Sequence, residues 1–528
     1  MAIFSEEQVL KVMYSYNPWW KIGQIPQSMV KSIKRIAYYK AMQTFQEKTL
    51  KRYIVLSGAR RVGKTTILYQ MIEELLKNGV SEKNILYLSL DNPILKFGTL
   101  DKILEIYQNM ILPEGQIYIF LDEIQYSQDW NHWLKVFYDQ NKNWSIVATG
   151  SASPLIEQGV HESGVGRWIT ITVPTLSFYE YCELLQSNGQ YPETEEFKKF
   201  MEQVTTLDKD SYQINGQTEE LLKKVMEKFL LENMEINKIQ EKIPKDFTIA
   251  KLEEYTDEQL RDIINTLEPI KKYFNRYLML GGFPELALSK NDKLAQTILR
   301  EDIVDKVLKR DMPALFKIRN ISTLEKVFLY LCFESSNIIN YTAMSQDLES
   351  VSVPTLQDYV KYLENANLIY VSEQVNSNGA KLLKSKPKIY IADSAIRNAV
   401  LMKDDVLSDA TEMGYVVETA VFRHVYTYIQ NTSGEIGYYR EGKSDKEIDI
   451  ITKSVKENMY IEVKYQENPS IKTENPIYTQ VGKNDKLFMI TKNVENTGIM
   501  KLDNGKNLVK IPAFAYLFLL GLEEFRRI

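Results

Sequence analysis

The sequence is poor in the residues that build disulfides and transition-metal sites. Its 528 residues include two cysteines, Cys182 and Cys332, which lie far apart and form no CxxC pattern. This argues against a zinc site and against a disulfide framework, and it suits a reducing cytoplasm. The three histidines, His132, His161 and His424, are scattered singly, so we expect structural roles for them rather than a histidine metal site.

Long apolar runs and a basic excess are also absent. The longest apolar run, FAYLFLLGL near the C-terminal end, is too short to cross a bilayer and indicates a buried element. The opening MAIFSEEQVL carries acidic residues where a signal peptide would be basic. The formal net charge of -5 gives no overall basic field, so binding of nucleic acid would depend on local patches. We therefore expect a cytoplasmic protein without membrane contact.

The sequence does contain enough apolar material for several packed domains. Its length and its hydrophobic content of 44% suit about three or four domains. Between residues 50 and 185, helical segments alternate with five short apolar runs: RYIVLSG, NILYLSLD, QIYIFLDE, WSIVATGS and WITITVP. This alternation predicts a parallel sheet with helices on both faces. Residues 186–270 are charged and helix-periodic, which predicts a helical insertion whose charges form a solvated face or, as the alternative, a partner surface.

A phosphate-binding loop is the most specific motif. The segment GARRVGKT, residues 58 to 65, fits GxxxxGK[ST] and stands between a strand-like run and a helix-periodic one. In this setting backbone N–H groups surround the phosphates, Lys64 reaches the β and γ phosphates, and Thr65 supplies a magnesium ligand. The predicted nucleotide-binding residues are Gly58, Ala59, Arg60, Arg61, Val62, Gly63, Lys64, Thr65, Thr66 and, from a later strand, Ser151.

Two acidic residues end the third apolar run. Asp122 could hold magnesium through its water shell, and the adjacent Glu123 could orient the attacking water, which predicts hydrolysis rather than nucleotide sensing alone. The next run ends in Thr149 and Ser151, where a polar side chain could sense the γ-phosphate. Arg167, in GVGRW, is a candidate arginine finger for its own subunit or a neighbour, although an ordinary surface role is equally open.

A β-hairpin pattern in residues 447–465, EIDIITKSVKENMYIEVKY, carries charged residues that a structural hairpin does not need. Asp449 on the first strand, and Glu462 and Lys464 on the second, could converge on one spot. Two carboxylates that reach one divalent ion, with a lysine beside them, suit phosphodiester cleavage. Glu418, in the helix-periodic GYVVETAVFRHV, could add a further carboxylate. A solvated salt-bridge cluster is the alternative that the residues alone leave open.

Residues 340–375 indicate a helix, a turn, a helix opened by Pro354 and then a strand, an order that suits a winged helix. The second helix carries Lys361 but also Asp358 and Glu364, so we favour a structural or protein-contact role over base readout. The basic patch KLLKSKPK that follows could contact phosphates, or it could be a wing exposed to solvent. Its lysines are Lys381, Lys384, Lys386 and Lys388.

Eight segments of the chain together resemble the motifs of a known protein family. They are NPWW, LSGARRVGKTT, IFLDEIQ, ATGSASPLI, GRWITITVPTLSFYEY, GGFPE, YYREGKSDKEIDII and YIEVKY. These segments resemble a family of prokaryotic AAA-type ATPases, over nearly the whole chain except residues 186–270. In that family the ATPase domain is followed by a C-terminal domain of unknown function that contains a winged helix and a PD-(D/E)xK endonuclease-like fold.

The resemblance implies an α/β multidomain protein. We expect an AAA-type P-loop parallel sheet with a helical insertion, a winged helix, and an α/β restriction-endonuclease-like C-terminal domain. The expected segments are an N-terminal helical segment (1–45), a P-loop ATPase core (46–185), the helical insertion (186–270), a helical lid or connector (271–325), the winged helix (326–380) and the nuclease-like domain (381–528).

The expected function is ATP binding and hydrolysis coupled to a metal-dependent nuclease-like domain that acts on nucleic acid, in defence or mobile-element biology as the resemblance suggests. The alternative is an ATP-driven switch or scaffold whose nuclease-like domain does not cut. The expected cofactors are ATP and Mg²⁺, with Mn²⁺ as an option in the nuclease-like site, and the expected partners are DNA, further copies of the chain and a protein bound by the insertion. The expected catalytic residues are Glu123, Arg167, Asp449, Glu462 and Lys464, and the expected metal ligands are Thr65, Asp122, Glu418, Asp449 and Glu462.

Overall fold

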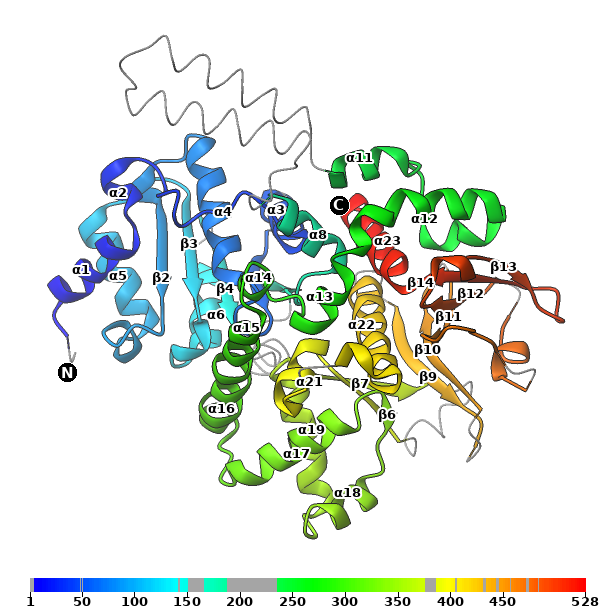
Figure 1. The fold of residues 1–528 in the computed structure, drawn as a ribbon. Coiled ribbons are helices and arrows are strands. Elements are labelled where there is room, and N and C mark those ends of the chain that lie inside the picture. Colours follow the sequence, from blue (N-terminus) through cyan, green and yellow to red (C-terminus); the bar gives the residue numbers. More distant parts are fainter. Residues whose placement is uncertain are drawn as a thin grey trace.

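The computed structural model describes residues 4–47, 49, 51–140, 143–150, 166–187, 235–375, 386–403, 406–430, 434–442, 446–455, 457–471, 474–482 and 484–528. Three predictions fall outside these residues and stay predictions: Ser151 as a phosphate sensor, the first half of the helical insertion, and the first lysines of the KLLKSKPK patch. The described residues form two β-sheets with helices around and between them (Figure 1).

The first sheet has five parallel strands in the spatial order β2-β3-β4-β1-β5. Each strand coincides with one of the five apolar runs of the sequence, so the predicted parallel sheet is confirmed. The strands are β1 (Tyr53–Ser57), β2 (Ile85–Ser89), β3 (Ile117–Asp122), β4 (Trp144–Gly150) and β5 (Trp168–Thr172).

Helices cover both faces of this sheet. Successive residues of a strand point to opposite faces, so an apolar strand contributes side chains to the core on each face. Ile54 and Leu56 belong to one core and Tyr53 and Val55 to the other, which explains why β1 is buried along its whole length. The first core includes α3 (Ile36–Gln46) and α4 (Lys64–Lys77), and the second includes α1 (Glu6–Tyr16), α5 (Leu100–Ile111) and α6 (Trp130–Gln140). Short elements in this region are α2 (Trp19–Ile22) and the 3-10 helices η1 (Glu82–Asn84), η2 (Leu95–Phe97) and η3 (Ile124–Tyr126).

A run of helices connects the first sheet to the rest of the chain (Figure 1). Its last part, before the small module described next, includes two π-helical turns, which are uncommon and often occur at functional positions. The elements are α8 (Phe178–Ser187), α11 (Glu235–Lys242), η5 (Ile249–Glu254), α12 (Asp257–Lys271), α13 (Phe274–Leu280), α14 (Pro284–Ala287), α15 (Asp292–Ile298), the π-helices η6 (Leu299–Asp305) and η7 (Val307–Asp311), and α16 (Met312–Phe316).

A small module follows, in which the described residues form three helices and three strands. Its last strand pairs antiparallel with the other two, although it lies beyond the predicted boundary at residue 380. The predicted domain boundaries stay predictions. In chain order the elements are α17 (Ile321–Phe333), β6 (Asn337–Ile338), α18 (Tyr341–Asp347), α19 (Val353–Asn365), β7 (Ile369–Gln374) and β8 (Lys388–Ile391).

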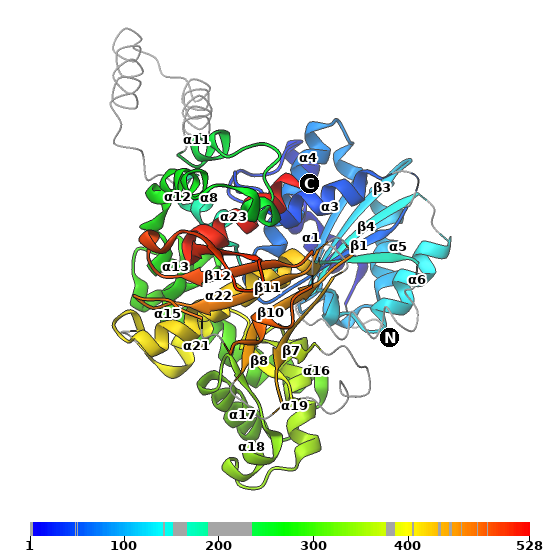
Figure 2. The ribbon, with the colours of Figure 1, turned by 90° about the vertical axis from the view of Figure 1, so that its right-hand side faces the viewer.

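The second sheet is mixed, and the described residues give it nine strands in the order β13-β14-β12-β11-β10-β9-β7-β8-β6. Figure 2 shows its strands β12, β11, β10, β7 and β8. The predicted hairpin is present, with β10 antiparallel to β11. Within the described residues β7 meets β9 through two residue pairs, so a short contact joins the small module to the C-terminal strands. The C-terminal strands are β9 (Glu435–Arg440), β10 (Glu447–Lys453), β11 (Met459–Lys464), β12 (Lys486–Thr491), β13 (Gly498–Lys501) and β14 (Asn507–Pro512).

The C-terminal apolar run FAYLFLLGL lies in helix α23 (Ala513–Arg526), which is buried along most of its length. It packs with α22 (Ala410–Gln430) and α8 in a core that also receives strands of the second sheet. The predicted buried element is confirmed. No helix of the described residues is both long and apolar enough to cross a membrane. The remaining short elements are α21 (Ser394–Leu401), η8 (Val406–Ser408), η9 (Pro476–Tyr478) and η10 (Val494–Asn496).

One carboxyl group on α8 is held in an environment that disfavours its charge. Burial raises the pKa of Glu183 to about 8, and the neighbouring Glu180 adds to the shift. Because the folded state then keeps a proton that the unfolded state releases near pH 4.5, the free energy of unfolding falls as pH rises from about 5 to 8. We expect Glu183→Gln to remove this contribution, which is at most about 1.4 kcal/mol per pH unit. Urea unfolding across this pH range measures it.

The matched control is Glu105→Gln, on an exposed position of α5. It makes the same chemical change on an exposed surface, away from α8, and should keep the wild-type dependence of stability on pH. Parallel curves for the wild type and Glu183→Gln would show that the Glu183 carboxyl group does not titrate in this range.

Candidate functional site

The predicted phosphate-binding loop connects the end of β1 to the start of α4. Gly58 has no room for a side chain, because a Cβ there would lie 2.1 Å from the carbonyl oxygen of Val173. Gly63 caps α4 with a φ of +95°, a left-handed conformation that glycine adopts without strain. Both glycines are thus required by the geometry of the loop. The N-terminus of α4, a favourable position for an anion, lies directly after it.

A cavity of about 540 Å³ lies beside the loop, and its lining includes Lys64 and Glu123. The Lys64 Nζ donates hydrogen bonds to the carbonyl oxygens of Gly58 and Ala59, each at 2.8 Å. Burial lowers the pKa of Lys64, while the nearby Glu123 and Asp122 carboxylates oppose this shift. The ammonium group is therefore folded back onto its own loop, within reach of the place where phosphates would bind.

Asp122, at the end of β3, accepts hydrogen bonds from three hydroxyl groups. Thr65 Oγ1 and the Tyr87 hydroxyl donate to its Oδ2 at 2.8 and 2.9 Å, and Thr149 Oγ1 donates to its Oδ1. Thr149 Oγ1 in turn accepts from the Glu123 amide at 3.0 Å. The structure thus brings the two predicted magnesium ligands, Thr65 and Asp122, into contact. A hydroxyl beside a carboxylate fits Mg²⁺, which prefers oxygen ligands.

Glu123 has a φ of +54°, which is uncommon for a residue with a side chain. Such strained backbone costs about 1–3 kcal/mol and tends to persist at functional sites. The Gln125 side-chain amide donates to the Glu123 carboxylate. Since Glu123 lines the same cavity as Lys64 and Thr65, the structure places it where the sequence predicts a water-orienting carboxylate.

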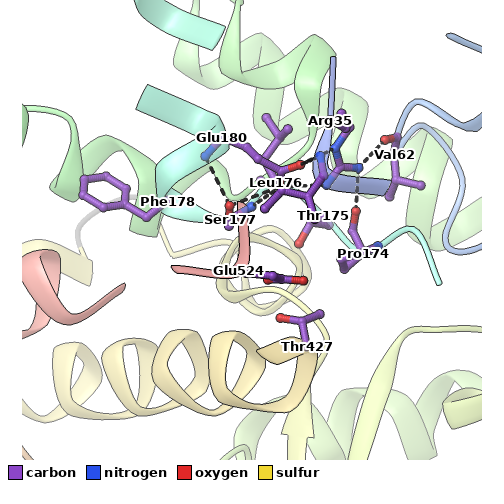
Figure 3. A network of polar contacts seen from close by, with 12 residues as sticks. Arg35, Val62, Pro174, Thr175, Leu176, Ser177, Phe178, Glu180, Thr427 and Glu524 are labelled. Atoms are coloured by element: carbon purple, nitrogen blue, oxygen red, sulfur yellow. Dashed lines mark hydrogen bonds and ion pairs between the residues drawn. The ribbon is translucent and has the colours of Figure 1, made fainter. Parts of the chain in front are cut away.

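A buried arginine that no motif marks supports the loop from the side (Figure 3). Arg35 Nη1 donates to the carbonyl oxygens of Val62 and Pro174, each at 2.7 Å. Its Nε and Nη2 donate to the two carboxylate oxygens of Glu180, at 3.2 and 3.0 Å. Burial alone would raise the pKa of Glu180, but Arg35 and two backbone amides hold it below its usual value. Arg35 therefore ties the loop to α8.

The two arginines of the loop contact the helical connector. Arg60 donates to both carboxylate oxygens of Asp311, from Nε at 2.5 Å and from Nη2 at 2.9 Å. Arg61 pairs with Glu285 at 2.7 Å and with Asp302 at 2.6 Å. Arg60 and Arg61 are predicted to bind nucleotide as part of this loop, whose backbone N–H groups surround the phosphates. Their guanidinium groups bind carboxylates here, and a bound phosphate would compete with those carboxylates for them.

Arg167 lies at the opposite edge of the first sheet from the loop. The carbonyl oxygen of Arg167 accepts a hydrogen bond from the amide of Tyr53, which is the first residue of β1. The phosphate-binding loop follows Ser57, which is the last residue of β1. Its guanidinium contacts Asp139 at 2.9 and 3.1 Å. Because β1 and β5 are parallel, about 15 Å of strand separates Arg167 from the loop. The prediction that Arg167 acts as an arginine finger in its own chain is therefore wrong. Its action on a neighbouring copy of the chain stays a prediction.

A second cavity, of about 710 Å³, lies at the second sheet. The four residues predicted to converge all line it: Glu418 from α22, Asp449 from β10, and Glu462 and Lys464 from β11. The hairpin register explains the convergence, since β10 and β11 are antiparallel and Asp449 Oδ2 accepts from the Val463 amide at 2.8 Å.

Lys464 and Asn475 hold the buried Glu462. The Lys464 Nζ lies 2.6 Å from Glu462 Oε2 and 3.7 Å from Asp449 Oδ2, and the Asn475 side chain donates to Glu462 Oε1 at 3.1 Å. Lys464 and Glu462 therefore form a close ion pair. Burial, together with Asp449, raises the pKa of Glu462 to about 7.

A second lysine, missed in the sequence, lies among the same carboxylates. The Lys388 Nζ is 2.8 Å from Glu418 Oε1, 2.7 Å from Glu447 Oε1 and 3.8 Å from Asp449 Oδ1. Its side chain is 3% exposed. The prediction that Lys388 belongs to a phosphate-contacting or solvent-exposed patch is wrong, because strand β8 directs it inward. Of the patch, Lys386 is exposed.

Glu418 is held between Lys388 and an aromatic hydroxyl. The Tyr390 hydroxyl donates to Glu418 Oε1 at 2.9 Å. Burial, together with Asp449, raises the pKa of Glu418 to about 6, although Lys388 and the Tyr390 hydroxyl oppose the shift. Burial would also lower the pKa of Lys388, but Glu418 and the neighbouring carboxylates hold it well above its usual value. Lys388 is therefore charged at neutral pH and neutralises its neighbours.

The expected metal centre does not fit this arrangement. Among the described residues, no three or more histidine, cysteine, aspartate or glutamate side chains are placed to hold one metal ion. The reason at this cavity is local. A divalent ion needs several oxygen ligands at about 2.0–2.6 Å. Lys388 instead stands between Glu418 and Asp449, and Lys464 between Asp449 and Glu462.

Three family models match parts of the chain. Residues 50–182 match an AAA domain, residues 271–407 a domain of unknown function (DUF8612), and residues 413–514 another domain of unknown function (DUF4143). An uncharacterized protein of Haemophilus influenzae is 25% identical over 450 residues, which cover 83% of this chain and 88% of that protein. One of Methanocaldococcus jannaschii is 22% identical over 476 residues, which cover 87% of this chain and 86% of that protein.

Two solved structures from Aeropyrum pernix are also similar. The ORC1 protein in complex with DNA is 10% identical, with 74% of this chain and 97% of that chain covered and a TM-score of 0.28. The ORC2 protein is 12% identical, with 70% and 92% covered and a TM-score of 0.31. TM-scores this low do not establish a shared overall fold. The match to the AAA domain covers the five-stranded sheet and the phosphate-binding loop, and it supports an AAA-type, ATPase-like P-loop domain in residues 50–182.

Proposed function

We propose that the chain hydrolyses ATP at the loop of residues 58–65 and couples its nucleotide state to a C-terminal domain that acts on nucleic acid. The observation that carries the first part is the contact of Thr65 with Asp122 beside the cavity that Lys64 and Glu123 line. Phosphoryl transfer to water requires a phosphate-binding loop, ligands for a cation and a carboxylate that orients the attacking water, and these residues supply all three.

Each side chain has a distinct role in the proposed hydrolysis. Lys64 would turn from the loop carbonyls to the β and γ phosphates. Thr65 and Asp122 would hold Mg²⁺, which when bound neutralises charge on the phosphates. Glu123 would accept a hydrogen bond from the attacking water and orient it toward the γ-phosphate.

Coupling would pass through the loop arginines. Phosphates that attract Arg60 and Arg61 would compete with the connector carboxylates of Asp311 and Asp302. The connector leads directly into the small module at α17, so loss of these pairs in one nucleotide state would change how the module is held.

The C-terminal part of the proposal is supported by the convergence of Glu418, Asp449, Glu462 and Lys464 on one cavity. Arg440 and Lys446 also line this cavity and could bind phosphate groups. The order helix, strand, helix, helix, strand, strand in residues 321–391 supports a winged helix next to a nuclease-like domain.

A non-cutting domain is the second candidate, and Lys388 is the observation that favours it. With Lys388 and Lys464 both among the carboxylates, the cavity is neutralised by the protein itself. A site of this kind can recognise a partner through its surface without cleaving it, and the ATPase would then act as a switch.

Cleavage assays separate the two candidates. The substrates are labelled single-stranded and duplex DNA and RNA, each with Mg²⁺ or Mn²⁺ and with or without ATP. If the domain cuts, Asp449→Asn and Lys464→Ala should each reduce the rate at least about 100-fold, because each removes a group that stabilises the reacting phosphate. The exposed Asp503→Asn and Lys501→Ala are matched controls and should cut like the wild type. ATP hydrolysis without cleavage of any substrate would contradict the nuclease and favour the switch.

A further inference from the structure

We propose that Lys388 is a built-in counter-cation that closes the carboxylate cavity. Its ammonium group takes the position between Glu418, Glu447 and Asp449 that a divalent cation would take, and the two cations exclude each other. This inference rests on the proposed function, because it concerns the regulation of the same cavity.

The distances support the exclusion. The Lys388 Nζ contacts one oxygen each of Glu418, Glu447 and Asp449, at 2.8, 2.7 and 3.8 Å. A divalent ion bound to these oxygens at about 2.0–2.6 Å would lie in the same space as the ammonium group. The like charges of the two cations would add repulsion to the steric conflict in this buried site.

The fold holds Lys388 in this position through its backbone. Lys388 begins β8 and is paired in register with Ile338 of β6 and with Ser372 of β7. Tyr390, two residues further along the strand, points to the same side and donates to Glu418. The charged end therefore enters the cavity as part of a paired strand, not as a free surface side chain.

Lys388 comes from a different module than the groups that it neutralises. Glu418, Glu447 and Asp449 belong to α22 and β10, whereas β8 pairs with β6 and β7 of the small module. The two modules meet in the second sheet through the short pairing of β7 with β9. A shift of the small module would thus withdraw the ammonium group and leave the carboxylates free to bind a cation.

Lys464 does not replace Lys388 in the cavity. Its Nζ lies 2.6 Å from Glu462 Oε2 and 3.7 Å from Asp449 Oδ2. Without Lys388, Glu418 and Glu447 lose the ammonium group that they contact, and together with Asp449 they are the carboxylates that a divalent ion could then bind.

The test measures Mn²⁺ binding to the full chain by the electron paramagnetic resonance signal of free Mn²⁺. All variants carry Asp122→Asn, which removes the carboxylate proposed to hold the metal ion at the ATP site, and all are assayed without nucleotide. We expect Lys388→Ala to bind one Mn²⁺ at least tenfold more tightly than the protein with Lys388, and to gain thermal stability from Mn²⁺. Lys388→Arg keeps the charge and should behave like Lys388, and addition of Asp449→Asn to Lys388→Ala should abolish the gain.

Two outcomes would overturn the proposal: equal Mn²⁺ affinity of the Lys388→Ala protein and of the protein that keeps Lys388, or no binding by either protein. Should Lys388→Ala not fold, Lys388→Met keeps the apolar stem without the charge and carries the same expectation. Failure of the proposed function is a separate result. A Lys388→Ala protein that binds Mn²⁺ through Asp449 but cuts no nucleic acid would contradict the nuclease, and it would leave the role of Lys388 intact.

Discussion

Glu123→Gln should hydrolyse ATP at least about 100-fold more slowly than the wild type while it binds ATP with similar affinity. The substitution keeps the size of the side chain and its place at the end of β3, but an amide accepts a proton from water far less readily than a carboxylate. Lys64, Thr65 and Asp122 are unchanged, so contacts with the phosphates and with Mg²⁺ should persist. Steady-state phosphate release gives kcat, and binding of a fluorescent ATP analogue gives Kd.

Two control variants test whether the loss of activity is specific to Glu123. Glu105→Gln makes the same chemical change on an exposed face of the ATPase domain and should leave kcat unchanged. Lys64→Ala removes the group that reaches the β and γ phosphates and should weaken ATP binding itself, unlike Glu123→Gln. A Glu123→Gln protein with kcat within threefold of the wild type would show that another group orients the water.

The ATPase site was largely predictable from the sequence because its signals are local. Five apolar runs predict the five strands, and a loop of eight residues between a strand and a helix predicts the phosphate site. The acids at 122 and 123 follow from the position where an apolar run ends. In each case the residues that matter are adjacent to the pattern that reveals them.

The second cavity was predictable only in part. Hairpin alternation brings Asp449, Glu462 and Lys464 together, and helical periodicity suggests Glu418. Lys388 was misjudged because it ends a run rich in lysine, which by composition indicates an exposed surface. Its burial depends on carboxylates 30 or more residues away, and no local pattern contains that information.

The supports of the loop were not predictable at all. Arg35 is separated from Glu180 by 145 positions, and Arg60 from Asp311 by 251. Such pairs carry no periodicity and no motif, and any of the 65 basic and 70 acidic residues would be equal candidates. Only the fold selects them.

Arg35→Ala should lower the free energy of unfolding by about 3–5 kcal/mol, because it leaves the buried Glu180 carboxylate without its partner. The side chains of Arg35 and Glu180 are 8% and 4% exposed, so water cannot replace the lost contact. The carbonyl oxygens of Val62 and Pro174 also lose their donor. Urea unfolding at neutral pH measures the change, and Arg261→Ala on an exposed face of α12 is the matched control.

The dependence on pH distinguishes a broken ion pair from a general loss of packing. Because Arg35 keeps the pKa of Glu180 below 4.5 in the folded state, the pair contributes stability above that pH and loses it as pH falls through the folded value. The difference between the wild type and Arg35→Ala should therefore shrink below about pH 4.5. Arg35→Met combined with Glu180→Leu should recover part of the stability, since it removes both charges and keeps apolar volume. A deficit that is constant with pH and persists in the double variant would mean that the contacts with the Val62 and Pro174 carbonyls, rather than the ion pair, carry the stability of this region.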